Sequence, residues 1–521
     1  MNHRTTLLAF FLLISVGLWL SQPVASYAFD CQSSGSGDWT NPAIWSGCGG
    51  GYPGQTTNDF VTIQSGHTVT LDNDLPSALY RLVIESGATF DLNGNALAFS
   101  ASGGTPGLEN SGTFTPDFGT IYFADSYGTA VHDVTGALNL AYVEIAGVGV
   151  TFNADALIDY ELVIETGGYV YNTAPTYGPN SALTYRAMGD YTAGAEWYAN
   201  VSSGQGVPRH VFVELGWVGF DPATLTLGAA DRTLTGDLTI SFSSFVAPPT
   251  GYSLFVGGSL STEFGDFDHN GGTLVFNGSG GQYLYPNLGR IDVNNLIVAA
   301  GSQVILPDPS MDGGVFADGT VTNNGRLSQT IYISPFETET SVVFIREDSL
   351  SGNDTKYIGL DIELVNVSTP HDGYDITVSI GGNQDCTTDP TSAPVQRCFD
   401  ISLWPSLGTG ESATVTFYYL PGEANGNPED GLTAYRWNGT NWQSAGTTVA
   451  HSSSGDPRWV QVAGISEFSP FILDDQAPTA VTLSTLTAHT PPAAPVFLLI
   501  LLVILSLGIS ARDRARAALF L

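Results

Sequence analysis

Carboxylates and an amide at alternating positions in GDFDHNGG form the nearest approach to a metal-binding motif in the chain. Asp266, Asp268 and Asn270, with Gly271 after them, follow the order in which a calcium loop begins. The twelfth position of such a loop is a bidentate Glu, but Asn277 stands there. A polar turn between two strands accounts for the same residues. Calcium is therefore the one cofactor that the sequence raises, with a plain turn as the competing interpretation.

Motifs of hydrolytic enzymes are missing. The sequence contains no GxSxG for a serine nucleophile and no HExxH for a zinc peptidase. Galacturonase-like enzymes carry GHG and RIK motifs, whereas Gly66-His67 continues with Thr68 and the single lysine, Lys356, follows a threonine. The sequence thus predicts no catalytic residue.

Two adjacent charge pairs are the places to inspect for polysaccharide lyase chemistry. Asp292 lies near Arg290, and Asp231 precedes Arg232. A lyase needs acids and a basic residue that converge on one face, whereas charge pairs in loops are usually solvated. We expect these pairs to be solvated.

Four cysteines, Cys31, Cys48, Cys386 and Cys398, form no CxxC pair. Pairing by proximity would join Cys31 to Cys48 and Cys386 to Cys398 in an oxidising compartment. This spacing favours structural disulfides over zinc binding or redox catalysis.

Tryptophans beside Gly and Asn turns suggest a different activity, since aromatic faces on a rigid scaffold can stack on sugar rings. The competing interpretation is that they cap the fold and fill its core. The residues concerned are Trp39, Trp45, Trp197, Trp217, Trp437 and Trp442.

The two ends of the chain are apolar. Arg4, an apolar run from Leu7 to Leu20 and small residues ending at Ala28 have the build of a secretory signal peptide, which we assign to residues 1–28. Residues 475–494 are a Pro/Thr-rich spacer, residues 495–511 an apolar segment and residues 512–521 a basic tail. This apolar segment predicts a transmembrane anchor, with a buried helix as the weaker alternative.

The chain is strongly acidic, with 15 Lys and Arg against 50 Asp and Glu and a formal net charge of −35. Such a field repels nucleic acid and anionic polymers, so it disfavours phosphate-backbone binding as a function. The membrane, through the C-terminal helix, is the first expected partner.

A glycine-centred phrase recurs along the chain. Residues before and after Gly66, Gly87, Gly167 and Gly301 alternate between apolar and polar, and the first two glycines stand about one coil apart. A period near 20 with β-branched residues is typical of stacked coils that bury one another's inner faces. We therefore predict a right-handed parallel β-helix for residues 29–334, with about 13 coils at about 4.8 Å each. His67 occupies a turn position in this repeat.

From residue 335 the alternating runs become longer. Seven strands separated by Gly, Pro and Asn turns predict an antiparallel β-sandwich over residues 335–474. The predicted fold class is therefore all-β, with one C-terminal transmembrane helix.

Three passages carry a resemblance. Residues 37–95, with SGDWTNPAIW and GHTVTLDND, resemble the start of secreted bacterial β-helix proteins and G8-type domains. Residues 175–199 and FDHNGGTLVFNGSGGQYL resemble modules of the same class. The order of signal, ectodomain, apolar segment and basic tail resembles C-terminally anchored bacterial surface proteins, although TPPAAP stands where a sortase motif would be. The resemblance implies an exported rod and selects no substrate.

These observations predict an exported protein anchored in the cell envelope, with its bulk extracellular and a non-catalytic structural or adhesive role. Surface carbohydrate or another envelope component is the expected binding partner. The alternative is a carbohydrate-active β-helix enzyme, which would need converging acids with an arginine or histidine in a groove.

Overall fold

The computed structural model describes residues 28–56, 58–100, 107–124, 131–218, 221–286, 289–308, 313–335, 341–345, 357–367, 373–382 and 393–478. Residues 1–27 of the predicted signal peptide, the spacer beyond residue 478, the predicted anchor and the basic tail lie outside these ranges. Within them the elements are β-strands and three short 3-10 helices: η1 (Pro42–Ile44), η2 (Pro421–Glu423) and η3 (Glu429–Gly431). No helix in the described ranges is long and apolar enough to cross a bilayer.

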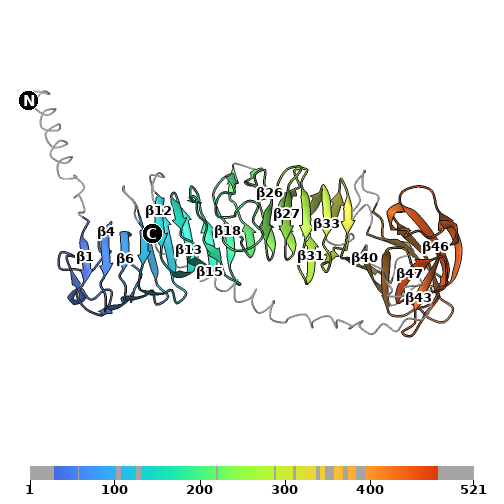
Figure 1. Ribbon diagram of the computed structural model, residues 1–521, viewed down its shortest axis with the longest axis horizontal. Helices are drawn as coiled ribbons and strands as arrows, with labels where there is room; N and C mark the ends of the chain where they lie inside the picture. The colour runs from blue at the N-terminus through green and yellow to red at the C-terminus, as the bar shows by residue number, and fades with distance from the viewer. Residues whose placement is uncertain are drawn as a thin grey trace, which may run out of the picture.

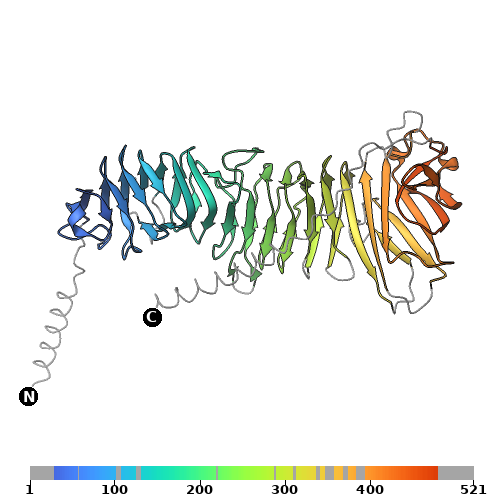
Figure 2. The same ribbon diagram turned by 90° about the horizontal axis from the view of Figure 1, so that it is seen from below.

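The chain forms a rod of stacked coils that ends in an antiparallel region (Figures 1 and 2). The rod is a parallel β-solenoid of about 11 turns, as the repeated phrase predicts, although the expected number was about 13. The difference arises because several coils are longer than the expected period. Arg186 and Glu214, in adjacent coils, are 28 residues apart, whereas Ser241 and Glu263 are 22 apart.

One parallel sheet runs through most of the rod, and we call it the long sheet. Its strands pair in register from coil to coil. They are β8 (Ala96–Phe99), β11 (Thr120–Ala124), β13 (Leu138–Ala146), β15 (Ala156–Ile164), β18 (Ala182–Tyr185), β20 (His210–Val213), β25 (Leu238–Ser241), β28 (Leu260–Glu263), β31 (Gly281–Tyr285), β34 (Gln303–Leu306) and β37 (Arg326–Ile333).

Further parallel ladders make up the other sides of the coils. In the first coils they are β1 (Asp30–Ser33), β4 (Asp59–Ile63), β6 (Leu79–Ile84), β9 (Gly107–Asn110), β12 (Val131–Thr135), β14 (Gly149–Phe152) and β16 (Tyr169–Val170), with β2 (Gly37–Asp38), β5 (Thr68–Thr70), β7 (Thr89–Asp91) and β10 (Thr113–Thr115) beside them. In the later coils they are β19 (Tyr191–Thr192), β23 (Thr224–Thr226), β26 (Ser244–Val246), β29 (Asp266–Asp268), β32 (Gly289–Val293) and β35 (Gly313–Ala317), and β24 (Arg232–Leu234), β27 (Ser253–Val256), β30 (Thr273–Phe276), β33 (Asn295–Val298) and β36 (Val321–Asn323). Short pairings add β3 (Trp45–Ser46), β17 (Thr176–Tyr177), β21 (Trp217–Val218) and β22 (Asp221–Pro222).

The core of the rod is a set of apolar columns, one residue per coil. Along the long sheet, residues that pair in register and are almost fully buried are Ile121, Val143, Leu162, Leu183, Val211, Leu238, Leu260 and Leu284. Burying each such side chain contributes about 1.5–3 kcal/mol, and most of that burial comes from the coils above and below.

The four repeated glycines are turn residues. Gly66, Gly87, Gly167 and Gly301 all have positive φ, from 72° to 84°, a conformation that other residues rarely adopt. Each stands between two strands, as the repeat predicts. The first three follow strands of the joined sheet that begins with β1, whereas Gly301 follows β33 in a different sheet. The phrase thus predicts the turn but not the side of the coil on which it lies.

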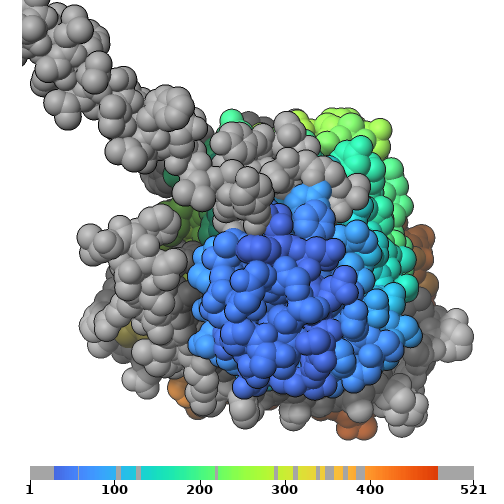
Figure 3. Space-filling view, turned by 90° about the vertical axis from the view of Figure 1, so that its left-hand side faces the viewer, coloured from blue at the N-terminus to red at the C-terminus, as the bar shows by residue number. Residues whose placement is uncertain are grey.

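The N-terminal end of the rod is closed by tryptophans. Trp39 and Trp45 are buried, with ring centroids 4.9 Å apart, and Trp39 also packs against Phe90. The indole N–H of Trp39 donates to the carbonyl of Pro53. Figure 3 looks along the rod at this end, where the N-terminal coils are blue. A solenoid needs such a cap, because its terminal coil has no neighbour to cover its core.

At the other end, β37 joins the rod to the antiparallel region. It pairs in parallel with β34 and antiparallel with β40 (Tyr374–Gly382), so the sheet is continuous across the junction. That sheet continues through β41 (Arg397–Trp404), β47 (Pro470–Asp474), β43 (Thr433–Trp437) and β44 (Trp442–Ser444). The second sheet contains β38 (Ser341–Phe344), β39 (Leu360–Val365), β42 (Ser412–Tyr419), β46 (Arg458–Ile465) and β45 (Thr447–Ser452). The two sheets meet through Phe399, Phe417 and Phe471.

Candidate interaction face

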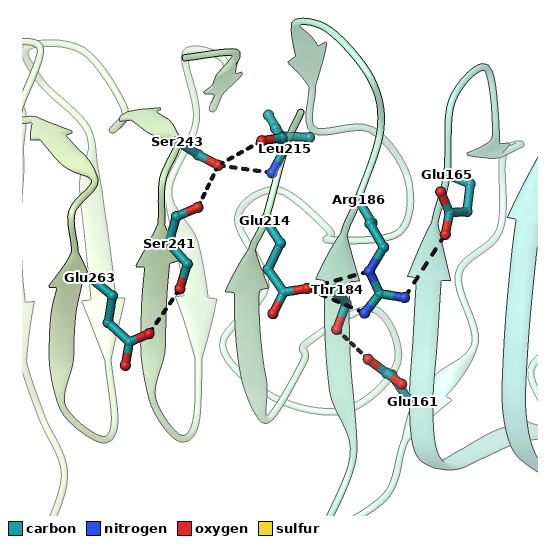
Figure 4. Close-up of polar contacts among 9 residues, drawn as sticks. All are labelled: Glu161, Glu165, Thr184, Arg186, Glu214, Leu215, Ser241, Ser243 and Glu263. Atoms are coloured by element: carbon teal, nitrogen blue, oxygen red, sulfur yellow. Dashed lines mark hydrogen bonds and ion pairs between the residues drawn. The ribbon is translucent and has the colours of Figure 1, made fainter. Parts of the chain in front are cut away.

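The outer side of the long sheet between β15 and β28 carries a row of polar side chains. They alternate along each strand with the buried column and reach from one coil to the next (Figure 4). Because strands in a sheet lie about 4.8 Å apart, residues in register form rows along the rod axis. We call this surface the outer face.

Arg186 bridges two acids on this face. Its guanidinium donates to Glu214 Oε2 at 3.2 and 3.4 Å and lies 3.9 Å from Glu165 Oε1. All three side chains are partly exposed. Ion pairs of this kind are typically worth less than about 1 kcal/mol, so their main effect is to hold the side chains in place along adjacent coils.

Hydroxyl groups hold the other acids of the row. Thr184 donates to Glu161 Oε1 at 2.7 Å, and Ser241 donates to Glu263 Oε2 at 3.2 Å. An ionised carboxylate has about four acceptor positions, so each of these acids retains capacity for another donor. The row is therefore a set of positioned hydrogen-bond acceptors.

His210 and Asp237 form a further contact between neighbouring coils. His210 Nδ1 lies 3.1 Å from Asp237 Oδ2, and the backbone N–H of Ser259 donates to the other carboxylate oxygen at 2.7 Å. The hydrogen bond from His210 lowers the pKa of Asp237 below its ordinary value; burial opposes this effect, and the Ser259 bond adds to it.

Two exposed phenylalanines lie directly beside the row. Phe242 follows Ser241, and Phe264 follows Glu263 in the next coil. Their rings are nearly parallel, with centroids 5.3 Å apart, and their exposed fractions are 53% and 57%. Both have positive φ, at 53° and 58°, which is rare for a bulky residue. Sequence reasoning missed this pair, although F-x-x-F recurs in SFSSFV and EFGDFD.

A buried polar cluster lies inside the rod behind this face. Glu196 is fully buried, and Tyr185 donates to its Oε1 at 3.1 Å. Arg232 is also buried nearby and lies close enough to affect the pKa values of the cluster. Burial raises the pKa of both Glu196 and Tyr185. Because solvent does not reach these groups, we interpret them as an internal support and not as a site.

The predicted calcium residues lie on another side of the coil. Asp266 and Asp268 point outward from β29, and both are exposed. Asn270 has positive φ, its N–H donates to Asp268 Oδ1 at 2.8 Å, and its side-chain amide donates to the carbonyl of Ala247. These are the contacts of a polar turn. The described residues contain no group of three or more His, Cys, Asp or Glu arranged to hold a metal ion.

Of the two adjacent charge pairs to inspect for lyase chemistry, Asp231 and Arg232 do not converge on one face. Asp231 is partly exposed and accepts the N–H of Ser253, whereas Arg232 points into the core. The expectation that this pair is solvated is therefore wrong for Arg232. Asp292 lies in β32 and is partly exposed, and the side chain of Arg290 lies outside the described residues.

His67 anchors its turn to the preceding coil. Its Nδ1 lies 2.7 Å from the Ser33 hydroxyl, which also accepts the N–H of Gln64. Ser33 is almost fully buried, so this serine is not placed to attack a substrate. The contact agrees with the turn position that the repeat predicts.

The Cys31–Cys48 disulfide is present, as predicted from proximity. Cys398 is also disulfide-bonded, and its predicted partner, Cys386, lies outside the described residues. Cys31–Cys48 closes the loop that carries the capping tryptophans, which gives it a structural place in the fold.

Among the six tryptophans, four are buried, and these fit the capping and core interpretation: Trp39, Trp45, Trp197 and Trp442. Trp437 is partly buried against Trp442, and the side chain of Trp217 lies outside the described residues. Among the described side chains of the rod, the exposed aromatic residues are phenylalanines and tyrosines.

A shallow depression of about 460 Å³ lies on the first coils. Asp30, Phe60 and Arg81 line it, and Arg81 is already paired with Glu109 at 2.6 Å. Because Arg81 is paired with Glu109, it is not a free basic group for a ligand in this depression.

Comparison with known proteins returns no match to a family model, to a curated protein or to a solved structure. The outer face must therefore be interpreted from its own chemistry.

Proposed function

We propose that this chain is an exported, non-catalytic rod that presents an adhesive face at the cell envelope. In this proposal a right-handed β-helix forms the stalk, an antiparallel β-sandwich lies nearest the membrane, and the C-terminal apolar segment anchors the protein through its Pro/Thr-rich spacer. The apolar segment, the basic tail and the signal-like N-terminus support this location.

One observation carries the proposed role: the outer face is regular along the rod and its polar groups contact adjacent coils. Arg186 and the acids beside it are arranged in a row, and exposed phenylalanines stand at the edge of that row. A row repeated at the coil spacing suits an extended partner, whereas a catalytic site needs groups that converge on one reacting atom.

The alternative is a carbohydrate-active enzyme, and Arg186 is the observation that favours it. An arginine between Glu165 and Glu214 has the residue types that a lyase uses. Both acids already contact the guanidinium, which supports a structural role for Arg186 in the proposed rod.

Two measurements test the proposal. Protease treatment of intact producing cells should release fragments of the rod, while a rod retained inside the cell would contradict the location. Incubation of the purified full-length protein with uronic-acid polymers should give no chain cleavage. Turnover that disappears in Glu214→Gln, but not in Asp74→Asn on an exposed turn, would establish the enzyme instead.

A further inference from the structure

The phenylalanine pair at the edge of the outer face is the feature that the fold explains least. In the same two coils, Phe245 and Phe267 form another nearly parallel pair, 5.6 Å apart, and this one is buried. Their burial stabilises the core. Phe242 and Phe264 leave more than half of their surfaces in water and adopt positive φ.

Both the exposure and the backbone conformation act against folding stability. A bulky residue in the left-handed region is strained by about 1–3 kcal/mol, and such strain persists where the surrounding structure fixes it, often at binding sites. The surroundings do fix it here. The N–H of Phe242 donates to the carbonyl of Glu263 at 3.0 Å, and Ser241 forms a bridge with Phe264. The backbone at Phe242 and Phe264 is therefore already held in this conformation without a ligand.

Residues with hydrogen-bonding side chains directly precede the two phenylalanines in the chain. Ser241 donates to Glu263, which retains acceptor capacity, and Glu214 lies in the same row in the preceding coil. Met188, which is 68% exposed, stands two residues after Arg186 at the corresponding edge of its own coil. A pyranose has an apolar ring face and hydroxyl donors. The two exposed phenylalanine rings and the acceptors next to them in the chain match these two surfaces.

We propose that Phe242 and Phe264, with Ser241 and Glu263, form a binding subsite for an uncharged glycan that lies along the rod axis. This inference rests on the proposed adhesive function and names its ligand class. Coils repeat at about 4.8 Å, close to the length of one sugar residue in an extended chain, so two successive sugars would meet Phe242 and Phe264. The net charge of −35 disfavours uronic acids, sulfated glycans and nucleic acid.

The test is calorimetric titration of the full-length protein in a detergent that has no sugar head group. The probes are cellohexaose, chitohexaose and mannohexaose, with hexagalacturonate as the anionic counterpart. We expect at least one neutral hexasaccharide to bind and hexagalacturonate not to bind. Phe242→Ala and Phe264→Ala should each weaken that binding at least tenfold, and Glu263→Gln should weaken it less.

Phe118→Ala is the matched control. Phe118 is 60% exposed and has positive φ, but it precedes β11, outside the outer face, and its ring is tilted by 46° against Tyr160. Its removal should leave the affinity within twofold of the original. Equal losses at Phe118 and Phe264 would overturn the assigned subsite.

Two further outcomes would overturn the inference. The first is that none of the three neutral hexasaccharides binds. The second is that the Phe variants change the sedimentation of the protein without changing glycan binding, which would make the pair a contact between two copies of the chain. Both leave the proposed adhesive function standing, whereas cleavage of any probe would contradict that function independently of the subsite.

Discussion

Two pairs of phenylalanines in the same two coils have opposite environments. Phe245 and Phe267 pair in register inside the rod, and they are 0% and 5% exposed. Phe242 and Phe264, three residues earlier in each coil, lie outside and are more than half exposed. The two pairs have the same residue type, the same partner coils and nearly the same ring separation.

The comparison separates the two reasons for which a solenoid repeats a residue. Stacking inside the rod removes apolar surface from water, and this is the main stabilising effect in a repeat fold. The outer pair recovers only part of that effect and carries an unfavourable backbone conformation. The inner pair is explained by stability, and the outer pair needs a functional explanation.

The largest expected effect is the difference between the two positions when each ring is removed. Phe267→Ala should lower the free energy of unfolding by about 3–5 kcal/mol, because it opens a cavity in the core. Phe264→Ala should change it by less than about 0.5 kcal/mol. Urea unfolding of the full-length protein, followed by circular dichroism, measures both values.

Phe245→Ala and Phe242→Ala repeat the comparison in the adjacent coil and serve as its internal control. Similar losses of stability at the inner and outer positions would show that the outer rings also support the fold, and the functional explanation would then be unnecessary.

A second difference between inside and outside concerns acids. Burial raises the pKa of Glu196, so its protonated form is favoured in the folded state. The stability that this group contributes is fully present below its unfolded pKa and is lost as the pH rises through the raised folded value. Relative to Glu196→Gln, the native protein should therefore lose stability as the pH rises above the unfolded pKa of a glutamate, about 4.3.

Asp237 on the outer face is the control, because its contribution to stability should change with pH in the opposite direction. The His210 hydrogen bond lowers its pKa, so its contribution is present above the unfolded pKa and is lost as the pH falls through the lower folded value. The effect should be smaller, because the Asp237 side chain is 48% exposed. Unfolding free energies of the native protein, Glu196→Gln and Asp237→Asn are compared above and below a pH of about 4. Differences from the native protein that change with pH in the same direction for both variants would contradict the assignment.

The sequence alone predicts the stacking of the coils, because it depends on local chemistry. Gly66, Gly87, Gly167 and Gly301 stand where only a residue tolerant of positive φ fits, and apolar alternation defines the inner face. The number of coils was wrong because coil length varies. The chain between Arg186 and Glu214 adds residues that no fixed period anticipates.

The candidate site was less predictable for a physical reason. In F-x-x-F the two rings stand three residues apart, and strand alternation places them on opposite faces without saying which one is inside. The bend at Phe242 decides this, and it depends on contacts with the next coil. The buried cluster of Glu196 and Arg232 could not be predicted for the same reason. Arg232 follows Asp231 in the sequence, which suggests a solvated pair, but its side chain is buried in the core.

The smallest expected effect concerns β29, where inward Phe267 lies between outward Asp266 and Asp268. The N–H of Asn270 already uses Asp268 as its acceptor, in the geometry of a turn. We therefore expect a chelator to leave the thermal unfolding temperature of the full-length protein unchanged, and Asp268→Ala to shift it only slightly. Calcium at a free concentration of 100 times the dissociation constant would add about 2.7 kcal/mol to the free energy of unfolding, so the measurement is sensitive enough. A clear decrease on chelation that is absent in Asp268→Ala would establish calcium at this turn. That result would also mean that the outward residues of β29 contribute to stability, whereas we expect a contribution only from the inward Phe267.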